Sequence, residues 1–166
     1  MIEEVHANLF DIQADAIVNP VNCVGVMGKG IALEVKKRYP RSYRAYRVAC
    51  ECGHLRPGVL FYVAGQGSER NVIHFASKDH WRQPSQLEWI EAGLEDLRRH
   101  YAAWGLTSIA MPQLGCGLGK LDWEDVRPLT WTTFEREPLE VIVSISTADQ
   151  YEGQGQAQLS IFDTSD

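Results

Sequence analysis

The sequence has little of what membrane-embedded, secreted or duplex-wrapping proteins carry. No apolar run approaches the roughly 18 residues of a membrane-spanning helix. The first ten residues are acidic and do not resemble a signal peptide, so we expect a cytoplasmic protein with no membrane contact. Lys and Arg number 16 against 22 Asp and Glu, a net charge of -6. This balance disfavours the many phosphate contacts of long duplex binding, but it leaves room for a nucleotide or a short strand.

Cysteine is also scarce, with four residues in the chain. The segment 50–54, CECGH, offers two thiols and a histidine, but no second pair of ligands follows it. A structural zinc site there would need a fourth ligand from elsewhere in the chain. We therefore expect no metal, and we expect the thiols to be small packing residues of a reducing compartment.

What the sequence does contain is an alternation of strand-like and helix-like segments. Its 166 residues suit one domain. Apolar runs predict strands at 2–7, 15–21, 58–65, 70–77, 107–114 and 139–146, and helical periodicity predicts helices at 31–39, 41–50, 84–105 and 122–137. This alternation predicts an α/β fold with a largely parallel, buried sheet. We expect the domain to span 1–150, and the polar stretch 151–166 to be a loosely ordered tail.

Two glycine-rich loops each follow a predicted strand. The first runs GVMGKG at 25–30 and the second GCGLG at 115–119. Neither has the spacing of a Walker A loop or a dinucleotide fingerprint. Their backbone N–H groups can bind an anion, and a helix starting after the first loop adds its N-terminal dipole. Because ligands of such sheets bind beyond the strand ends, the pair predicts a phosphate-bearing ligand. The alternative is two tight turns without a ligand.

The stretches DAIVNPVNCVGVMGKGIALEVKKRYP and MPQLGCGLGKLDWEDVRPL resemble the macrodomain family, over roughly residues 2–146. The resemblance is strongest to the DarG-like branch of DNA ADP-ribosyl glycohydrolases, which are antitoxins, and to the related terminal ADP-ribose glycohydrolases. It implies a three-layer α/β/α sandwich with a mixed, mostly parallel central sheet. It also implies ADP-ribose as ligand or product, without a further cofactor.

The resemblance assigns substrate-binding roles by motif. Asn22 corresponds to an asparagine that hydrogen-bonds the distal ribose, and the alternative for it is an Asx turn after Pro20. Asn8 and Leu9 fall beside the adenine, where most macrodomains carry Asp in place of Asn8. Asn19 is expected to be structural. The two loops are expected to enclose the pyrophosphate through Gly25, Val26, Met27, Gly28, Gly30, Gly115, Cys116, Gly117, Leu118 and Gly119.

Lys78 is the predicted catalytic residue, since the resembled branch has a catalytic lysine at this position, just past a strand end. A neutral lysine amine can attack the anomeric carbon of ADP-ribose, and burial or a nearby positive charge lowers the pKa of such an amine. The alternative is a solvated loop lysine. His80, Trp81 and Arg82 follow it as possible DNA contacts, although Trp81 could equally pack at the base of the loop.

Gly119 departs from the human terminal glycohydrolase, which has an aspartate there. This loss favours ADP-ribosyl-thymidine in single-stranded DNA over a protein-linked ester. The segment 36–47, KKRYPRSYRAYR, interleaves basic and aromatic residues, as single-strand binders do, but an ordinary amphipathic helix has the same pattern.

The expected function is therefore an ADP-ribosyl glycohydrolase acting on single-stranded DNA, the antitoxin of a DarT-like toxin. One alternative is a hydrolase of protein-linked ADP-ribose or O-acetyl-ADP-ribose. Another is an ADP-ribose-1″-phosphate phosphatase, and the last is a module that binds ADP-ribose without cleaving it.

Overall fold

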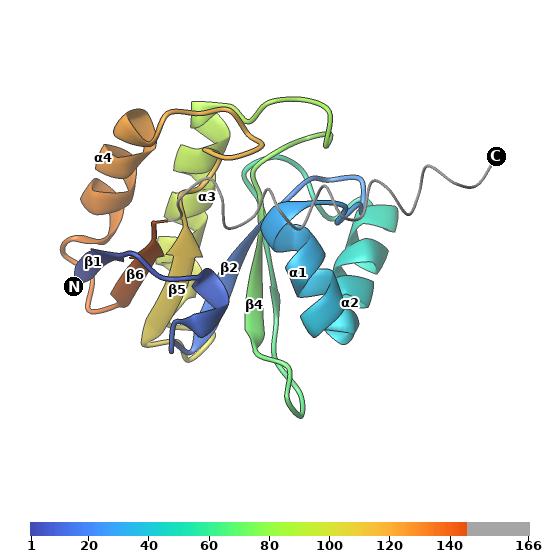
Figure 1. Cartoon of the computed structure of the whole chain (residues 1–166), viewed down its shortest axis with the longest axis horizontal. Helices are drawn as coiled ribbons and strands as arrows, with labels where there is room; N and C mark the ends of the chain where they lie inside the picture. Colours follow the sequence, from blue (N-terminus) through green and yellow to red (C-terminus); the bar gives the residue numbers. More distant parts are fainter. Residues whose placement is uncertain (146–166) are drawn as a thin grey trace.

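A computed structural model describes residues 1–145 as one six-stranded sheet between two pairs of helices (Figure 1). The strands lie in the order β1-β6-β5-β2-β4-β3. All neighbouring strands are parallel except β3, which is antiparallel to β4 at one edge. The strand bounds are β1 (Ile2–Val5), β2 (Ala16–Val21), β3 (Leu60–Val63), β4 (Asn71–Ala76), β5 (Ser108–Pro112) and β6 (Glu140–Ser144). This confirms the mixed, mostly parallel sheet.

The four predicted helices are present as α1 (Gly30–Arg38), α2 (Pro40–Glu51), α3 (Leu87–His100) and α4 (Trp123–Phe134). Asp122 caps α4 through its carboxylate, which accepts a hydrogen bond from the Glu124 N–H at 2.9 Å. Pro40 separates α1 from α2, because it suits the first turn of a helix better than the interior. Not predicted was η1 (Leu9–Asp11), a 3₁₀ turn capped by Asn8.

Alternate residues of the central strands face opposite layers, which is why the strands are apolar throughout. Val18 of β2 packs with Ile90 and Leu94 of α3, whereas its neighbour Ile17 packs in a second cluster with Val35 and Tyr46 of α1 and α2. Figure 1 shows α1 and α2 on one side of the sheet and α3 and α4 on the other. The three-layer sandwich is therefore confirmed. The predicted domain end at 150 and the tail 151–166 lie outside the described residues.

Three adjacent central strands, β5, β2 and β4, deliver their loops to one edge of the sheet. The loop after β2 contains the first glycine run, and the loop after β5 contains the second. The loop after β4 contains Lys78. The parallel register of these strands thus brings together segments that lie up to about a hundred residues apart in sequence.

Candidate active site

The first glycine loop is shaped by the buried side chain of Asn22. Its carbonyl oxygen accepts the N–H groups of Val24 at 3.1 Å and Val26 at 3.3 Å, and its amide donates to the Val26 carbonyl at 2.7 Å. This is the Asx-type turn that stood as the alternative role of Asn22. Gly25 lies inside the turn with a φ of +87°, in the left-handed region that glycine enters without strain. Asn22 therefore holds the loop whether or not it also meets a ribose.

Tyr46 of α2 stabilises the same turn through its hydroxyl group. Its buried hydroxyl donates to the Asn22 backbone carbonyl at 2.7 Å and lies 3.0 Å from the Asn22 side-chain oxygen. Burial raises the pKa of Tyr46, so the hydroxyl stays protonated and able to donate. This role was not predictable from the sequence, because a tyrosine on the inner face of a helix has the same pattern as ordinary core packing.

The second glycine loop is packed closely around Gly115 and Gly119. Gly115 has a φ of +74°. A Cβ added at Gly119 would lie 2.4 Å from the Gly115 carbonyl oxygen and 2.5 Å from the Ser85 hydroxyl oxygen, closer than real Cβ contacts allow. In the present loop geometry, position 119 therefore excludes any side chain, including an aspartate. By contrast, a Cβ at Gly117 would meet nothing within 4 Å.

Backbone hydrogen bonds tie the loop after β4 to both glycine loops. On one side, the Cys23 N–H donates to the Asp79 carbonyl at 3.1 Å. On the other, the Ser85 N–H donates to the Gly119 carbonyl at 3.0 Å. The Lys78 N–H also bonds to the Val21 carbonyl at the end of β2, at 3.3 Å. The structure thus brings the three predicted segments into one connected site.

The side chain of Lys78 reaches across to the second loop. Its Nζ donates to the Leu118 carbonyl oxygen at 2.8 Å. The side chain is half-buried. Burial lowers the pKa of Lys78, and the positive charge of Lys120 lowers it further. Both causes named in the sequence analysis are therefore present, and they increase the fraction of neutral, nucleophilic amine.

Asn8 and Leu9 lie at η1, before β2. The Asn8 side-chain oxygen accepts the Phe10 N–H at 2.9 Å, and Leu9 is fully buried. The oxygen that was expected to accept from adenine therefore already caps the 3₁₀ turn, although a carbonyl oxygen has a second lone pair. Their predicted contact with adenine stays a prediction.

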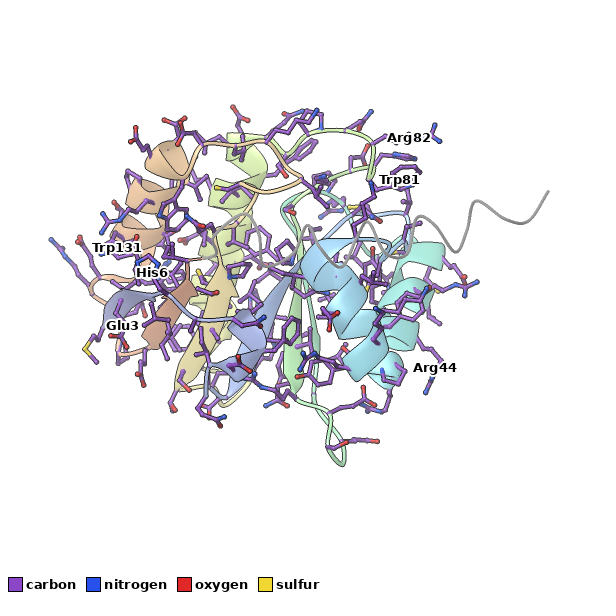
Figure 2. All side chains as sticks on the ribbon, viewed as in Figure 1. Glu3, His6, Arg44, Trp81, Arg82 and Trp131 are labelled. Carbon is purple, nitrogen blue, oxygen red and sulfur yellow. The ribbon has the colours of Figure 1, made fainter. Side chains whose placement is uncertain are left out.

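Trp81 and Arg82 lie on the outer part of the loop after β4 (Figure 2), and His80 and Arg82 both stack on the Trp81 ring. The His80 and Trp81 ring centroids are 5.3 Å apart, and the Arg82 guanidinium carbon lies 4.6 Å from the Trp81 centroid. Trp81 remains 46% exposed, so it is not packed at the base of the loop.

The basic helix α2 has a more ordinary arrangement. Tyr46 is buried, Arg47 pairs with Glu51 at 3.3 Å, and Arg41 donates to the Ala64 carbonyl. These contacts are typical of a solvated amphipathic helix, the alternative reading of this segment.

The cysteines are free thiols, and three of the four are half-buried. Burial raises the pKa of Cys23 to about 12 and that of Cys116 to about 11. Thiols with such pKa values are weak nucleophiles at neutral pH. Within residues 1–145, no cluster of three or more His, Cys, Asp or Glu side chains could hold a metal ion. Nor does any helix in this range have the length and apolarity to span a membrane.

A hollow of about 500 Å³ between α3 and the segment before β3 shares no lining residue with these loops. Three of its charged groups are engaged with one another or with the backbone. Glu95 pairs with Arg99 at 3.1 Å, and Asp96 accepts the Leu60 N–H at 3.2 Å. The loops at the strand ends, with their exposed backbone and an amine of lowered pKa, are the stronger candidate site.

Residues 18–130 match the family model of the Macro domain. The chain is 46% identical over 140 residues to a DNA ADP-ribosyl glycohydrolase of Mycobacterium tuberculosis, covering 83% of this chain and 40% of that protein. It is 33% identical over 142 residues to a DNA ADP-ribosyl transferase-DNA ADP-ribosyl glycohydrolase fusion protein of Thermosipho africanus, covering 75% and 37%. The chain thus spans about two fifths of the length of these curated relatives.

Solved structures agree with these matches. The macrodomain of Mycobacterium tuberculosis DarG superposes with a TM-score of 0.82 at 45% identity, covering 88% of this chain and 99% of that chain. Thermosipho africanus DarTG, solved in complex with ADP-ribose, has a TM-score of 0.81 at 30% identity, covering 90% and 42%. The sheet order, the two strand-end glycine loops and these matches agree, and the chain belongs to the macrodomain family.

Proposed function

We propose that this protein removes ADP-ribose from thymidine in single-stranded DNA. The observation that carries the proposal is the position of the Lys78 amine. It lies at hydrogen-bond distance from the Leu118 carbonyl oxygen of the second glycine loop, and its pKa is lowered. The relatives named DNA ADP-ribosyl glycohydrolase support the substrate class.

The glycine loops are the proposed site of the ADP-ribose pyrophosphate. A Cβ at Gly30 or Gly117 would meet nothing within 4 Å, so glycine at these positions lets the ligand approach the backbone. Glycine at 25, 115 and 119 instead lets the loops pack against the protein in the shape that presents their N–H groups. Helix α1 begins at Gly30, and its N-terminal dipole and unpaired N–H groups face the strand-end edge of the sheet. Asn22 is proposed to meet the distal ribose through its remaining amide hydrogen, while its oxygen maintains the turn.

Lys78 is the proposed nucleophile. Its neutral amine forms a bond to the anomeric carbon of the distal ribose, while the bond from that carbon to the thymine nitrogen breaks and leaves its electron pair on the base. The base takes up a proton, and the attacking nitrogen gives one up. Water then adds to the anomeric carbon and displaces the lysine, which releases ADP-ribose and restores the amine. The hydrogen bond to Leu118 has to break before the attack.

The packing at Gly119 favours DNA over a protein-linked ester as substrate. The resemblance aligns Gly119 with an aspartate of the human terminal glycohydrolase. In this chain, a Cβ at position 119 would collide with the Gly115 carbonyl and the Ser85 hydroxyl. The proposed site therefore contains Lys78 but lacks the aspartate. The exposed Trp81 ring is proposed to stack on a flanking base, and Arg82 is proposed to contact a phosphate.

The proposed partner is a DarT-like toxin that attaches ADP-ribose to DNA. The fusion of the two activities in one Thermosipho africanus relative supports this pairing. A hydrolase of this specificity would reverse the toxin's product and so act as its antitoxin, with or without direct contact between the two proteins.

The test is a gel assay on a single-stranded oligonucleotide that carries ADP-ribosyl-thymidine. We expect the wild type and Lys37→Ala, an exposed lysine of α1, to restore the unmodified band, and Lys78→Ala to lose at least a hundredfold in rate. Trp81→Ala should slow cleavage of the oligonucleotide, and Trp81→Phe should keep most of it. If Lys78→Ala retains full activity, the lysine mechanism is wrong. If the wild type only binds ADP-ribose, the protein is a binding module or acts on another linkage.

A further inference from the structure

Lys120 has an unusual backbone conformation for its residue type. Its φ is +64°, and among residues 1–145 it is the one non-glycine residue with a positive φ. A lysine there is strained, because its Cβ crowds the backbone in the left-handed region. Glycine would adopt this conformation without strain, as Gly115 does five residues earlier. Such strain persists only where the surroundings impose it, and it gathers at functional sites.

Hydrogen bonds on both sides of Lys120 impose the conformation. The Lys120 N–H donates to the Gly117 carbonyl at 3.1 Å, and the Leu121 N–H donates to the Gly115 carbonyl at 2.9 Å. The preceding carbonyl, that of Gly119, accepts the Ser85 N–H at 3.0 Å. The position of Lys120 is therefore fixed by two bonds within the second loop and by the Ser85 bond that connects this loop to the Lys78 loop.

Lys120 follows closely on the loop segment that binds the Lys78 amine. The Lys78 amine bonds to the Leu118 carbonyl, two residues before Lys120, and the charge of Lys120 disfavours the protonated form of Lys78. Two carboxylates on these loops also have identified effects. Asp122 caps α4 through the Glu124 N–H, and burial together with the charge of Asp79 raises the pKa of the Cys23 thiol.

Three further polar side chains of these loops have hydrogen bonds to backbone groups and none to either lysine amine. The His80 Nδ1 accepts the Arg82 N–H at 3.1 Å, and the Cys23 thiol donates to the Lys78 backbone carbonyl rather than to its amine. Cys116, on the second loop, bonds to the Leu114 carbonyl. Lys29 at the start of α1 is the other cation of the glycine loops, and it lies on the first one.

We propose that Lys120 is a positioning residue that acts through Lys78, because it holds a second positive charge on the loop segment whose Leu118 carbonyl binds the Lys78 amine. The inference rests on the proposed function. A bound pyrophosphate carries two negative charges, which would favour protonation of Lys78 and weaken it as a nucleophile. A second cation on the adjoining loop offsets that effect. The same charge attracts the anionic substrate to this edge of the sheet.

The test compares Lys120→Arg, Lys120→Asn and Lys120→Gly. Arginine keeps the charge, whereas asparagine and glycine remove it and tolerate the left-handed conformation. In protein labelled with ¹³C at the lysine ε-carbons, a pH titration by NMR reads the pKa of Lys78 directly, with Lys78→Ala used to assign its signal. We expect the wild type and Lys120→Arg to agree. In Lys120→Asn and Lys120→Gly, the pKa of Lys78 should rise by about half a unit to one unit.

Single-turnover rates on the modified oligonucleotide give the second readout. At pH values below the pKa of Lys78, the rate of the two uncharged variants should fall about three- to tenfold, because a smaller fraction of the Lys78 amine is neutral. At high pH their rate should return to that of the wild type. Lys37→Asn is the matched control and should change neither readout. Lys120→Gly should also raise Tm, because glycine removes the backbone strain at position 120. A raised Tm would show that the second loop keeps its fold in this variant.

Several results would overturn the role of Lys120. One is an unchanged pKa of Lys78 in both uncharged variants. Another is a raised KM at every pH with no shift of the profile, which would make Lys120 a phosphate contact. Loss of rate in Lys120→Arg would show that shape, not charge, matters. If the wild type shows no turnover while the NMR shift appears, the proposed substrate fails and the effect of Lys120 on Lys78 stands.

Discussion

At the scale of single residues, burial decides which ionisable groups can do chemistry. Lys78 is half-buried at the strand-end edge, so its pKa falls while its amine can still reach a ligand. His74 of β4 is fully buried and hydrogen-bonded to Asn19 at 3.2 Å and Ser42 at 2.9 Å, with Tyr46 stacked on its ring. Burial lowers the pKa of His74 to about 3. The lysine is suited to reactivity, and the histidine is a structural group of the core.

His74 predicts how stability depends on pH. Its folded pKa is about 3 and its ordinary value is 6.5, so the unfolded chain binds the proton more readily. Stability is therefore complete above pH 6.5 and falls as the pH drops toward 3. Between pH 7.5 and 5.0 we expect the free energy of unfolding to decrease by about 2 kcal/mol, measured by urea denaturation.

The control separates His74 from the exposed histidines. His74→Gln should flatten this dependence between pH 5.0 and 7.5, whereas His6→Gln, on the exposed end of the chain near β1 (Figure 2), should leave it unchanged. An unchanged slope in His74→Gln would show that another group is responsible for the acid sensitivity. The pKa of Asp15 is lowered from its ordinary value of 3.8, so Asp15 affects the pH dependence of stability mainly below pH 3.8, outside this range.

At the scale of elements, the site depends on close contact between loops. The second glycine loop has no room for a Cβ at Gly119 but has open space at Gly117, two residues away. The carbonyl of the intervening residue, Leu118, binds the Lys78 amine. A small displacement of this loop would therefore move both the proposed pyrophosphate site and the hydrogen-bond partner of the proposed nucleophile.

The pair Gly119→Ala and Gly117→Ala tests this coupling with one methyl group each. We expect Gly119→Ala to lower the free energy of unfolding by about 1–3 kcal/mol, because a backbone oxygen cannot yield to the added carbon. Its cleavage rate should fall as well. Gly117→Ala should stay within about 0.5 kcal/mol of the wild type, as surface substitutions usually do. Thermal melts and the gel assay measure both effects.

Equal behaviour of the two variants would contradict this account. It would mean that the second loop shifts freely enough to accept a side chain at Gly119. In that case the packing would no longer disfavour an aspartate there, and the preference for DNA over a protein-linked ester would lose its structural support.

At the scale of the whole molecule, the central strands connect the ligand site to the core. β5, β2 and β4 are adjacent, and the loops that leave their ends make the site. Ligand binding at this edge should therefore stabilise the fold as one unit, because a ligand that binds only the folded state shifts the unfolding equilibrium.

Free ADP-ribose is the ligand for this measurement. At a concentration about 100 times Kd we expect the folded state to gain about 2.7 kcal/mol and Tm to rise by roughly 5–10 °C in differential scanning calorimetry. AMP, which lacks the pyrophosphate and the distal ribose, should give a much smaller shift. Lys78→Ala should keep most of the ADP-ribose shift, since the lysine is proposed to act in the reaction rather than in binding. An equal shift with AMP would place the recognition on the adenosine part alone.

The sequence by itself determined the order and the type of the main elements. Apolar alternation and helical periodicity are local signals, so β2, β4, α3 and α4 could be located without a structure. Helical periodicity placed a helix start at 122, where Asp122 caps α4, and glycine-rich segments predicted two loops at strand ends. The resemblance then singled out Lys78 and Asn22. All of these signals lie within a few residues of the feature they predict.

The tertiary structure decided how those loops meet and which charges act on one another. The bonds from Cys23 to Asp79, from Ser85 to Gly119 and from the Lys78 amine to Leu118 end on backbone carbonyls, which every residue type possesses. A sequence pattern therefore carries no mark of them. The pKa of Lys78 depends on burial and on a charge 42 positions along the chain, and the strain at Lys120 depends on bonds from its loop. These are properties of distance in space, which only the folded chain defines.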